Sequence, residues 1–322
     1  MNPITTAPIT PSVLIAVDGS PASLQAVRYG IGMAGLIPGL KFVLLNVLPS
    51  PPPIFASEAR TDAAMKKRLE RLEEANRRRA EDVVALARDE AVRGGIEPDR
   101  IETRVRARRG GLAKDIITEA ELGHFDAIVV GRRGLTLAQE IFMGSVSSQL
   151  IQHAANVPLW INDGEVTEPR VLVAIDGSEA SLRAVDHVSF MLGRNPETRI
   201  EFLHVTPKLQ AFCPVIFPNS EDLPDADALE QDFLRNNQDC LESFYHRAMS
   251  ILAEAGVSRD RVSFQEKEVL LGVARTIVRE AKEGGFGTVV VGRRGLGQSS
   301  YLGSVSDRVI RRADNLAVWL VG

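Results

Sequence analysis

VLIAVDGSPASLQAV, from Val13 to Val27, returns as VLVAIDGSEASLRAV from Val171 to Val185, an offset of 158 residues. Two further stretches repeat in the same order, VVGRRGL at Val129–Leu135 and Val290–Leu296, and GSVS at Gly144–Ser147 and Gly303–Ser306. Such internal repeats set the architecture ahead of any local pattern. The best-preserved stretches are an Asp-Gly-Ser turn after one apolar run and spaced glycines after another. The repeat therefore concerns a binding site as well as a fold.

Length and composition bound the class of protein. A chain of 322 residues suits two domains of about 150 residues, and the offset predicts domains at 1–164 and 165–322. Hydrophobic residues at 44% and charged residues at 25% are typical of a soluble globular protein. The net charge of −4 argues against a nucleic-acid or membrane-surface partner.

Cysteine usage and the N-terminal sequence indicate the compartment. Cys213 and Cys240 both lie in the second half, so a structural disulfide or metal site shared by the repeats is not expected. The first residues, MNPITTAPITP, lack the basic and apolar regions of a signal peptide. No apolar run approaches the roughly 20 residues that span a bilayer. We expect a cytoplasmic protein.

Strand and helix patterns alternate through each half. VLIAVD at Val13–Asp18 is typical of a strand buried on both faces. The proline cluster Pro49–Pro53 predicts a loop without regular structure, followed by a charged helix over Thr61–Arg93. This alternation predicts an α/β fold with two tandem doubly wound domains. Other expected elements are helices at 20–34, 112–122 and 141–155, strands at 41–48, 101–107, 127–130, 158–161, 171–176, 200–206, 262–267, 288–291 and 318–321, and a linker at 162–169.

Residues suited to an anion and a sugar follow the first and fourth strands. In an open parallel sheet, ligands bind beyond the carboxyl ends of the strands, where Asp18 and Gly131 are expected. Glycines let backbone amides turn towards an anion, and Gly144-Ser145 is expected near a helix start that favours phosphate. The hydroxyls of Ser145 and Ser147 add donors. The Asp18 carboxylate suits ribose hydroxyls or an adenine amine.

These motifs resemble those of the universal stress protein family in its tandem, ATP-binding form. The family signature G-x2-G-x9-G-[S/T] is matched at Gly131, Gly134, Gly144 and Ser145, and the resemblance covers nearly the whole chain twice. It places the acidic position at Asp18 and the adenine-lining position at Val47. The resemblance implies a five-stranded parallel sheet per domain, an ATP site between the first and fourth strands, and stress-linked regulation with weak or absent hydrolysis. It also implies a homodimer contact through the last strands, which would place Trp160 and Trp319 near a contact between domains or subunits.

The second half departs from this signature. Only seven residues separate Gly292-Arg293-Arg294-Gly295 from Gly303-Ser304, so its phosphate loop is two residues short. Asp176 and Val205 keep the other two positions. A shorter loop either still cradles a phosphate or pulls its amides out of register, and both alternatives stay open.

Several arginines allow two interpretations. Arg132 and Arg133, like Arg293 and Arg294, flank the glycine turns and either neutralise phosphate or lie solvated in the loop. Arg104, Arg106 and Arg108 share one face of a strand, where charges guarding a sheet edge are favoured over a nucleic-acid patch. The helix over Thr61–Arg93 is interpreted as a charged, solvent-exposed helix, with partner docking as the alternative.

Three functions compete. The intact nine-residue spacer and Asp18 favour an ATP-binding stress-response regulator with an unidentified regulatory protein partner. An interaction scaffold of the same fold without nucleotide is the alternative. An ATP-using enzyme is disfavoured, because no GxxxxGK[ST] loop occurs and no general base adjoins the predicted phosphates. We therefore expect no catalytic residue and no protein-held metal, with Mg²⁺ carried by the ATP phosphates and water.

Overall fold

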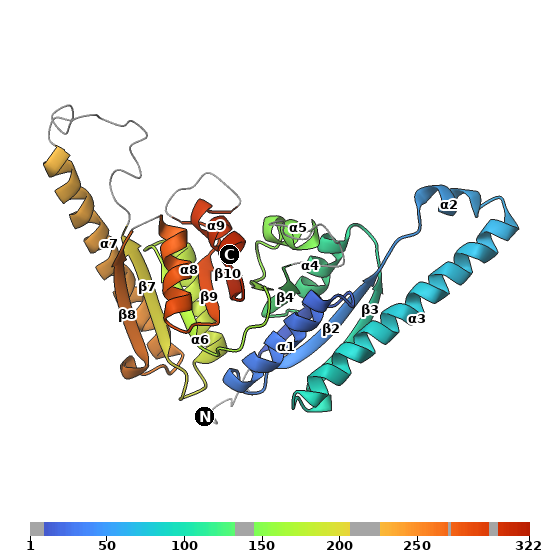
Figure 1. Ribbon diagram of the computed structural model, residues 1–322, viewed down its shortest axis with the longest axis horizontal. Helices are drawn as coiled ribbons and strands as arrows, with labels where there is room; N and C mark the ends of the chain where they lie inside the picture. The colour runs from blue at the N-terminus through green and yellow to red at the C-terminus, as the bar shows by residue number, and fades with distance from the viewer. Residues whose placement is uncertain (1–9, 133–144, 207–225, 270–271, 296–301) are drawn as a thin grey trace, which may run out of the picture. The chain divides into compact units, whose positions relative to one another are not determined.

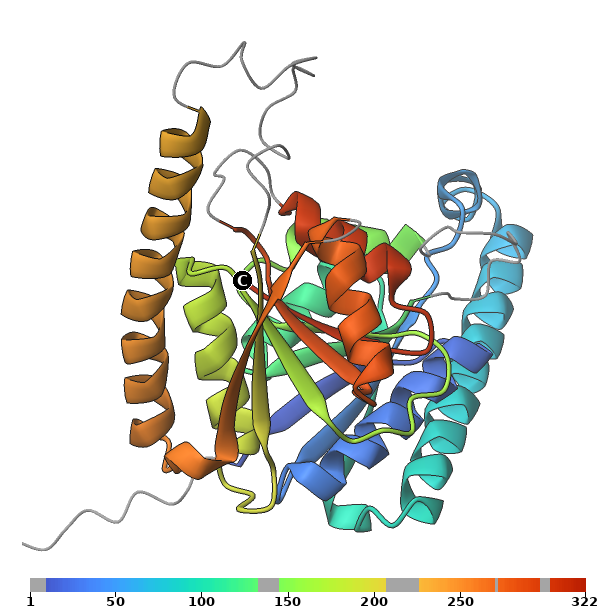
Figure 2. The same ribbon diagram turned by 60° about the vertical axis from the view of Figure 1, so that its left-hand side comes forward.

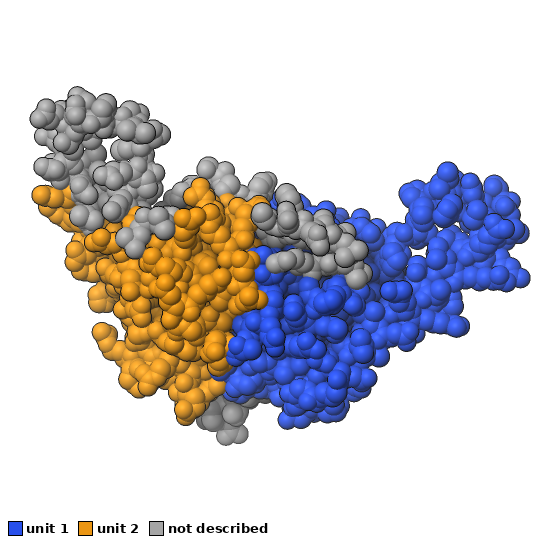
Figure 3. All heavy atoms as spheres, in the orientation of Figure 1, with its two compact units in different colours: residues 1–167 blue, residues 168–322 orange. Residues whose placement is uncertain are grey.

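The computed structural model describes residues 10–132, 145–206, 226–269, 272–295 and 302–322 (Figure 1). Contacts within the chain divide it into two compact units, residues 1–167 and 168–322 (Figure 3). Both units alternate strands with helices along the chain. None of the helices within these described ranges is long and apolar enough to cross a membrane.

The first unit contains a parallel sheet with the strand order β3-β2-β1-β4-β5. The chain builds outward from β1 to β3 and then returns to add β4 and β5 on the other side of β1. The strand order therefore reverses between β1 and β4, which is where such sheets bind ligands. The strands are β1 Ser12–Ala16, β2 Lys41–Leu48, β3 Ile101–Ala107, β4 Ala127–Gly131 and β5 Leu159–Asn162.

Helices cover both faces of this sheet. α1 and α3 contact each other, and α4 contacts α5, as expected when right-handed crossovers place successive pairs on opposite faces. The helices are α1 Pro21–Leu36, α2 Pro53–Glu58, α3 Ala63–Arg93, α4 Leu112–Leu122 and α5 Ser145–His153. The prediction of a doubly wound domain is confirmed for this half.

The second unit repeats this architecture with the strand order β8-β7-β6-β9-β10. α6 and α7 run beside each other, and α8 contacts α9 (Figure 2). The strands are β6 Val171–Ile175, β7 Ile200–Thr206, β8 Val262–Glu268, β9 Thr288–Gly292 and β10 Ala317–Val321. The helices are α6 Glu179–Leu192, α7 Ala226–Glu254, α8 Val273–Glu283 and α9 Ser304–Arg312.

The central strands are buried on both faces, because their apolar runs are unbroken. Val13, Leu14 and Ile15 of β1 have no exposed surface, and neither do Trp160 of β5 and Trp319 of β10. Each tryptophan packs edge-on against a ring from the first helix of its own unit, Tyr29 at a centroid distance of 6.3 Å and His187 at 5.5 Å, respectively. Both tryptophans are therefore core residues of their units.

Several element boundaries differ from the prediction. β1 ends at Ala16, so Asp18 lies just beyond the strand. The proline cluster was predicted to lack regular structure, but α2 begins at Pro53. That prediction was wrong at this residue, because proline at the first helical position has a suitable φ and loses no hydrogen bond. The predicted helix over 141–155 corresponds to α5, and residues 141–144 lie outside the described residues.

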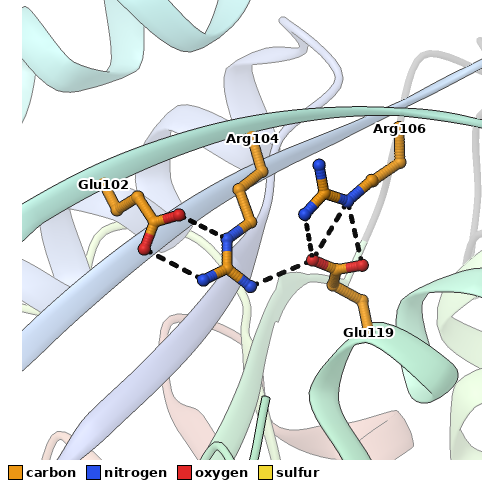
Figure 4. A network of polar contacts seen from close by, with 4 residues as sticks. All are labelled: Glu102, Arg104, Arg106 and Glu119. Carbon is orange, nitrogen blue, oxygen red and sulfur yellow. Dashed lines mark hydrogen bonds and ion pairs between the residues drawn. The ribbon is translucent and has the colours of Figure 1, made fainter. Parts of the chain in front are cut away.

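The arginines of β3 are neutralised by neighbouring carboxylates (Figure 4). Arg104 lies 2.6 Å from Glu102 and 3.0 Å from Glu119 of α4, and Arg106 lies 3.0 Å from Glu119. Burial raises the pKa of Glu119, but hydrogen bonds from Arg106 and Arg104 outweigh it, so the pKa falls below its ordinary value. Because β3 ends the strand order of its unit, these charges fit the guarded edge better than a free basic patch.

Candidate functional site

The Asp-Gly-Ser turn fixes a carboxylate beyond the first strand of the first unit. Gly19 has a φ of 81°, a conformation that glycine adopts without strain. The Asp18 carboxylate accepts a hydrogen bond from the Ser20 amide at 2.9 Å. Ser20 Oγ accepts from the Ser23 amide at 3.1 Å and so caps α1. Asp18 remains exposed, with its orientation set by the turn.

The second unit contains the same turn with an additional hydrogen bond. Gly177 has a φ of 82°, and Ser178 caps α6. The Asp176 carboxylate accepts from the Ser178 amide at 3.1 Å and from the Ser181 hydroxyl at 2.7 Å. Asp176 is half-buried and more firmly held than Asp18. Ser23 and Ser181 were missed as site residues, although both fall within the repeated DGSxxSL stretch.

Side chains from the second strand brace this turn in both units. Asn46 donates from Nδ2 to the Val17 carbonyl at 2.7 Å. His204 occupies the equivalent position, with its Nδ1 3.1 Å from the Ile175 carbonyl and its Nε2 3.4 Å from Asn237 of α7. Because a carbonyl only accepts, Nδ1 of His204 carries the proton. This histidine therefore supports the turn, and the adenine-side candidates Val47 and Val205 follow these braces on β2 and β7.

Glycines end the fourth strand because a helix passes close to the backbone there. A Cβ on Gly131 would lie 2.5 Å from the Ala22 carbonyl oxygen of α1. A Cβ on Gly292 would lie 2.9 Å from the Ala180 carbonyl carbon of α6. These contacts bring the first helix over the end of the fourth strand, so the two glycines are needed for packing whether or not a ligand binds.

The second serine of each GSVS motif binds the last helix of its unit to the end of the fourth strand. Ser147 donates from Oγ to the Gly131 carbonyl at 2.9 Å, and Ser306 donates to the Gly292 carbonyl at 2.6 Å. Both serines are buried. A hydroxyl has one proton to donate. In this geometry Ser147 therefore positions α5 and has no proton left for a phosphate.

The first arginine after each glycine is buried in the core of its unit. Arg132 lies 3.1 Å from the Asp163 carboxylate, and both side chains are about nine-tenths buried. Arg293 is also buried, and burial together with the charge of Arg294 lowers its pKa to about 10. The interpretation of Arg132 and Arg293 as solvated loop residues is therefore wrong, because both side chains are buried. Arg294 is exposed, and Arg133 lies outside the described residues.

The carboxylate and the glycine turn meet in the second unit. A Cβ on Gly295 would lie 2.5 Å from Asp176 Oδ2. A Cβ on Gly303 would lie 3.4 Å from the Gly295 amide nitrogen, and the Gly303 amide donates to the Arg293 carbonyl at 2.7 Å. α9 begins at the next residue, Ser304. An acidic side chain, a glycine backbone and a helix N-terminus thus converge at the reversal of the strand order.

In the first unit, the described parts of the site have the same framework. Asp18, Gly131 and Ser147 match Asp176, Gly292 and Ser306 in position, and exposed Ser145 opens α5. Gly131 and Ser147 also make the same contacts as their counterparts. Gly134 and Gly144 lie outside the described residues. Among the residues that the structure describes, no group of three or more His, Cys, Asp or Glu side chains is placed to hold a metal ion.

These features define the class: a tandem, doubly wound α/β protein with a candidate anion site at the strand reversal of each unit. The chain belongs to the universal stress protein family, which matches residues 11–161 and 169–321.

Solved structures agree with this fold. A universal stress protein from Archaeoglobus fulgidus is 20% identical with a TM-score of 0.62, covering 96% of this chain and 97% of that chain. A functionally unknown protein from Pseudomonas aeruginosa PAO1 is 15% identical with a TM-score of 0.52, covering 97% and 92%, respectively. A putative universal stress protein from Pseudomonas aeruginosa UCBPP-PA14 is 14% identical with a TM-score of 0.52, covering 97% and 93%. A search of curated proteins found no significant match.

Proposed function

We propose that this chain is an ATP-binding regulator of a cytoplasmic stress response, with weak or no ATP hydrolysis. The observation that carries the proposal is the convergence of Asp176, Gly295 and the start of α9 in one place. A carboxylate suits hydroxyls or an amine, and glycine amides beside a helix N-terminus suit phosphates. The two halves of a nucleotide thus have chemically matched partners within one short stretch of surface.

Each end of the nucleotide has assigned residues in this proposal. Asp18 and Asp176 hold the ribose or adenine end, beside Val47 and Val205. The phosphates lie against the backbone of Gly131, Gly134, Gly144 and Ser145 in the first unit, and of Gly292, Gly295, Gly303 and Ser304 in the second. Arg132 and Ser147, expected from the sequence to touch phosphate, support the site in this proposal. Arg132 pairs with Asp163, and Ser147 holds α5 to the Gly131 carbonyl.

Binding without rapid turnover suits this arrangement. Among the residues that the structure describes, the side chains closest to the glycine turns are serines, the paired or buried arginines and the Asp176 carboxylate. In this proposal Asp176 holds the ribose or adenine end and is not the base that activates a water at the phosphates. His204 is occupied in bracing the Ile175 carbonyl. Mg²⁺ would arrive with ATP and be held by phosphate oxygens and water.

One observation favours the scaffold alternative for the second unit. The Gly303 amide already donates to the Arg293 carbonyl at 2.7 Å, so the shortened loop closes on itself. The amides of the first turn of α9 remain as donors, because the first N–H groups of a helix have no partner within it. The second unit therefore offers a phosphate fewer amides than a loop with the full signature would.

Titration calorimetry with Mg·ATP on the full chain tests the proposal. Asp18→Asn and Asp176→Asn keep the turn but replace a carboxylate oxygen with an amide donor, and each should weaken or remove binding in its own unit. Glu81→Gln, at an exposed position of α3, is the matched control. Gly134→Val should abolish binding in the first unit and leave the fold intact. Wild-type affinity in Asp18→Asn, Asp176→Asn and Gly134→Val would overturn the assignment and favour the scaffold.

A further inference from the structure

The helical arm of the first unit, defined as residues 53–79, extends beyond its sheet (Figure 1). It consists of α2 and the first half of α3. No side chain of α2 is buried, and the first buried residue of α3 is Ala80. Helices in folded proteins gain most of their stability from the packing of an apolar face. α2 and α3 contact each other, but no side chain of the arm is fully buried, so the arm has little of the packing that normally supports such helices.

Apolar side chains are nevertheless present on this arm. Ile54, Phe55 and Leu72 are 63%, 41% and 44% exposed, respectively, while Met65 and Leu69 are half-buried. Met65, Leu69, Leu72 and Asn76 are spaced by four, three and four residues, so they form one stripe along α3. That spacing is the heptad pattern of a two-helix seam.

The charges around this stripe are complementary between two antiparallel copies of the same helix. KKRLERLEEA, from Lys66 to Ala75, carries a basic block at its start and an acidic pair near its end. Two copies placed antiparallel about the midpoint between Glu70 and Arg71 set Leu69 opposite Leu72. Lys67 then lies level with Glu74, Arg68 with Glu73, and Glu70 with Arg71. No like charges are level with each other in this segment.

We propose that the helical arm binds the same arm of a second copy of this chain, as an antiparallel helix pair. Leu69 and Leu72 of each copy form the centre of the contact, with Met65 of one copy against Asn76 of the other. Lys66 and Glu73 flank the seam and lie closest across it, while the outer charges attract at longer range. The existing pair between Glu74 and Arg78, at 2.9 Å, is exposed and leaves Glu74 open to a second cation.

A second copy explains the arm better than an acidic or basic partner does. Charges of both signs alternate in blocks along the same helix, so a partner of one sign would meet repulsion from half of them. The reversed copy is the arrangement in which each block meets its opposite. This contact is independent of the nucleotide proposal, because it uses none of the residues at the strand reversal.

Sedimentation velocity on the full chain across a concentration series tests the contact. The wild type should form dimers, and Leu72→Asp should raise the dimer dissociation constant roughly a hundredfold, since both copies lose a central leucine. Leu122→Asp is the matched control, because Leu122 is 77% exposed on α4 and lies outside the arm. A monomeric wild type at about 100 µM, or equal effects of the two substitutions, would overturn the proposal.

A pair of charge-reversal variants distinguishes loss of the contact from unfolding, because unfolded variants would not associate when mixed. An acidic variant, Lys66→Glu with Arg68→Glu, and a basic variant, Glu73→Lys with Glu74→Lys, should each fail to self-associate through like-charge repulsion. Mixed one to one with distinct fluorescent labels, the two should form heterodimers, detected by energy transfer. This transfer should weaken as salt screens the charges. Persistent homodimers of either variant, or no transfer on mixing, would contradict the antiparallel contact.

Discussion

Gly131 shows how tightly one residue constrains the site. Its missing Cβ admits the Ala22 carbonyl of α1 at a distance that no side chain tolerates. We expect Gly131→Ala to destabilise the first unit by about 2 kcal/mol, because the helix must shift off the strand. Gly32→Ala, on the exposed side of α1 with no atom within 4 Å of the added Cβ, should stabilise by about 0.5–1 kcal/mol.

Urea unfolding followed by Trp160 fluorescence in a Trp319→Phe background measures both glycine variants. The opposite signs are the test, since both substitutions add the same methyl group to the same unit. Equal stabilities for the two variants would show that the close contact between α1 and β4 is absent in solution.

His187 is the residue expected to make the second unit sensitive to acid. Burial lowers its pKa to about 3, from an ordinary value of 6.5. Because the folded state resists protonation, stability is intact above pH 6.5 and falls as the pH drops towards 3, by roughly 1.4 kcal/mol per unit. Tyr29 occupies the equivalent position against Trp160 in the first unit and has no such liability.

In the His187→Tyr variant, the free energy of unfolding of the second unit should therefore depend less on pH below pH 6.5. Between pH 6.5 and 4.5 the stability of the wild type relative to the variant should fall by roughly 2 kcal/mol. Unfolding followed by Trp319 fluorescence in a Trp160→Phe background gives this difference. A constant difference across that pH range would mean that His187 is not buried as a neutral ring.

Among individual residues, contacts with neighbours in the chain were predictable from the sequence, and contacts between distant residues were not. The Asp-Gly-Ser turn was predictable because Asp18 and Ser20 act through their own neighbouring backbone. The roles of Arg132 and Ser147 were not predictable. Their partners, Asp163 and the Gly131 carbonyl, are distant in sequence and are brought close by packing. A glycine-rich pattern identifies available amides but says nothing about competing partners.

At the scale of elements, β3 and α4 are joined by the charge network of Arg104, Arg106 and Glu119. We expect Glu119→Gln to destabilise the first unit by about 1 kcal/mol at pH 7, since half-buried Arg104 and the more exposed Arg106 both lose a charged acceptor. Hydrogen bonds from the arginines hold the pKa of Glu119 below its ordinary 4.5 despite burial, so this stabilisation exists above that pH and disappears as pH falls through the folded pKa.

Urea unfolding at pH 7 and at about pH 3 measures the contribution of this network. The deficit of Glu119→Gln should shrink as the pH falls through the folded pKa of Glu119, because the wild-type carboxyl then loses its charge as well. Glu81→Gln, on exposed surface of α3, should have little effect at either pH. A deficit that persists undiminished in acid would assign the loss to packing and not to charge.

The elements themselves were predictable where periodicity and burial agreed. Both ends of β7, Ile200–Thr206, were predicted correctly, because its apolar run is bounded by turn residues. α2 was not predicted. The run of prolines before it favours a loop, and the pattern does not distinguish Pro53, the residue at which the helix begins, from the other prolines. The projection of the first half of α3 was not predictable either. Its charge pattern suits any exposed helix, and only the structure shows that burial starts at Ala80.

For the whole molecule, duplication gives two copies of one fold with unequal phosphate loops. The first unit keeps nine residues between its glycine pairs and the second only seven. In the second unit that shorter loop closes through the Gly303 amide. We therefore expect the first unit to bind nucleotide more tightly than the second.

Mass analysis of nucleotide released from the purified full chain, with its stoichiometry, tests the central claim most directly. We expect an adenine nucleotide at one equivalent per chain, rising towards two when ATP is added in excess. Asp18→Asn should lose the tightly held equivalent, while Asp176→Asn should lose only the second. A wild-type chain that releases no nucleotide and takes up none at millimolar Mg·ATP would contradict the account and leave a stress-protein fold that acts as a scaffold.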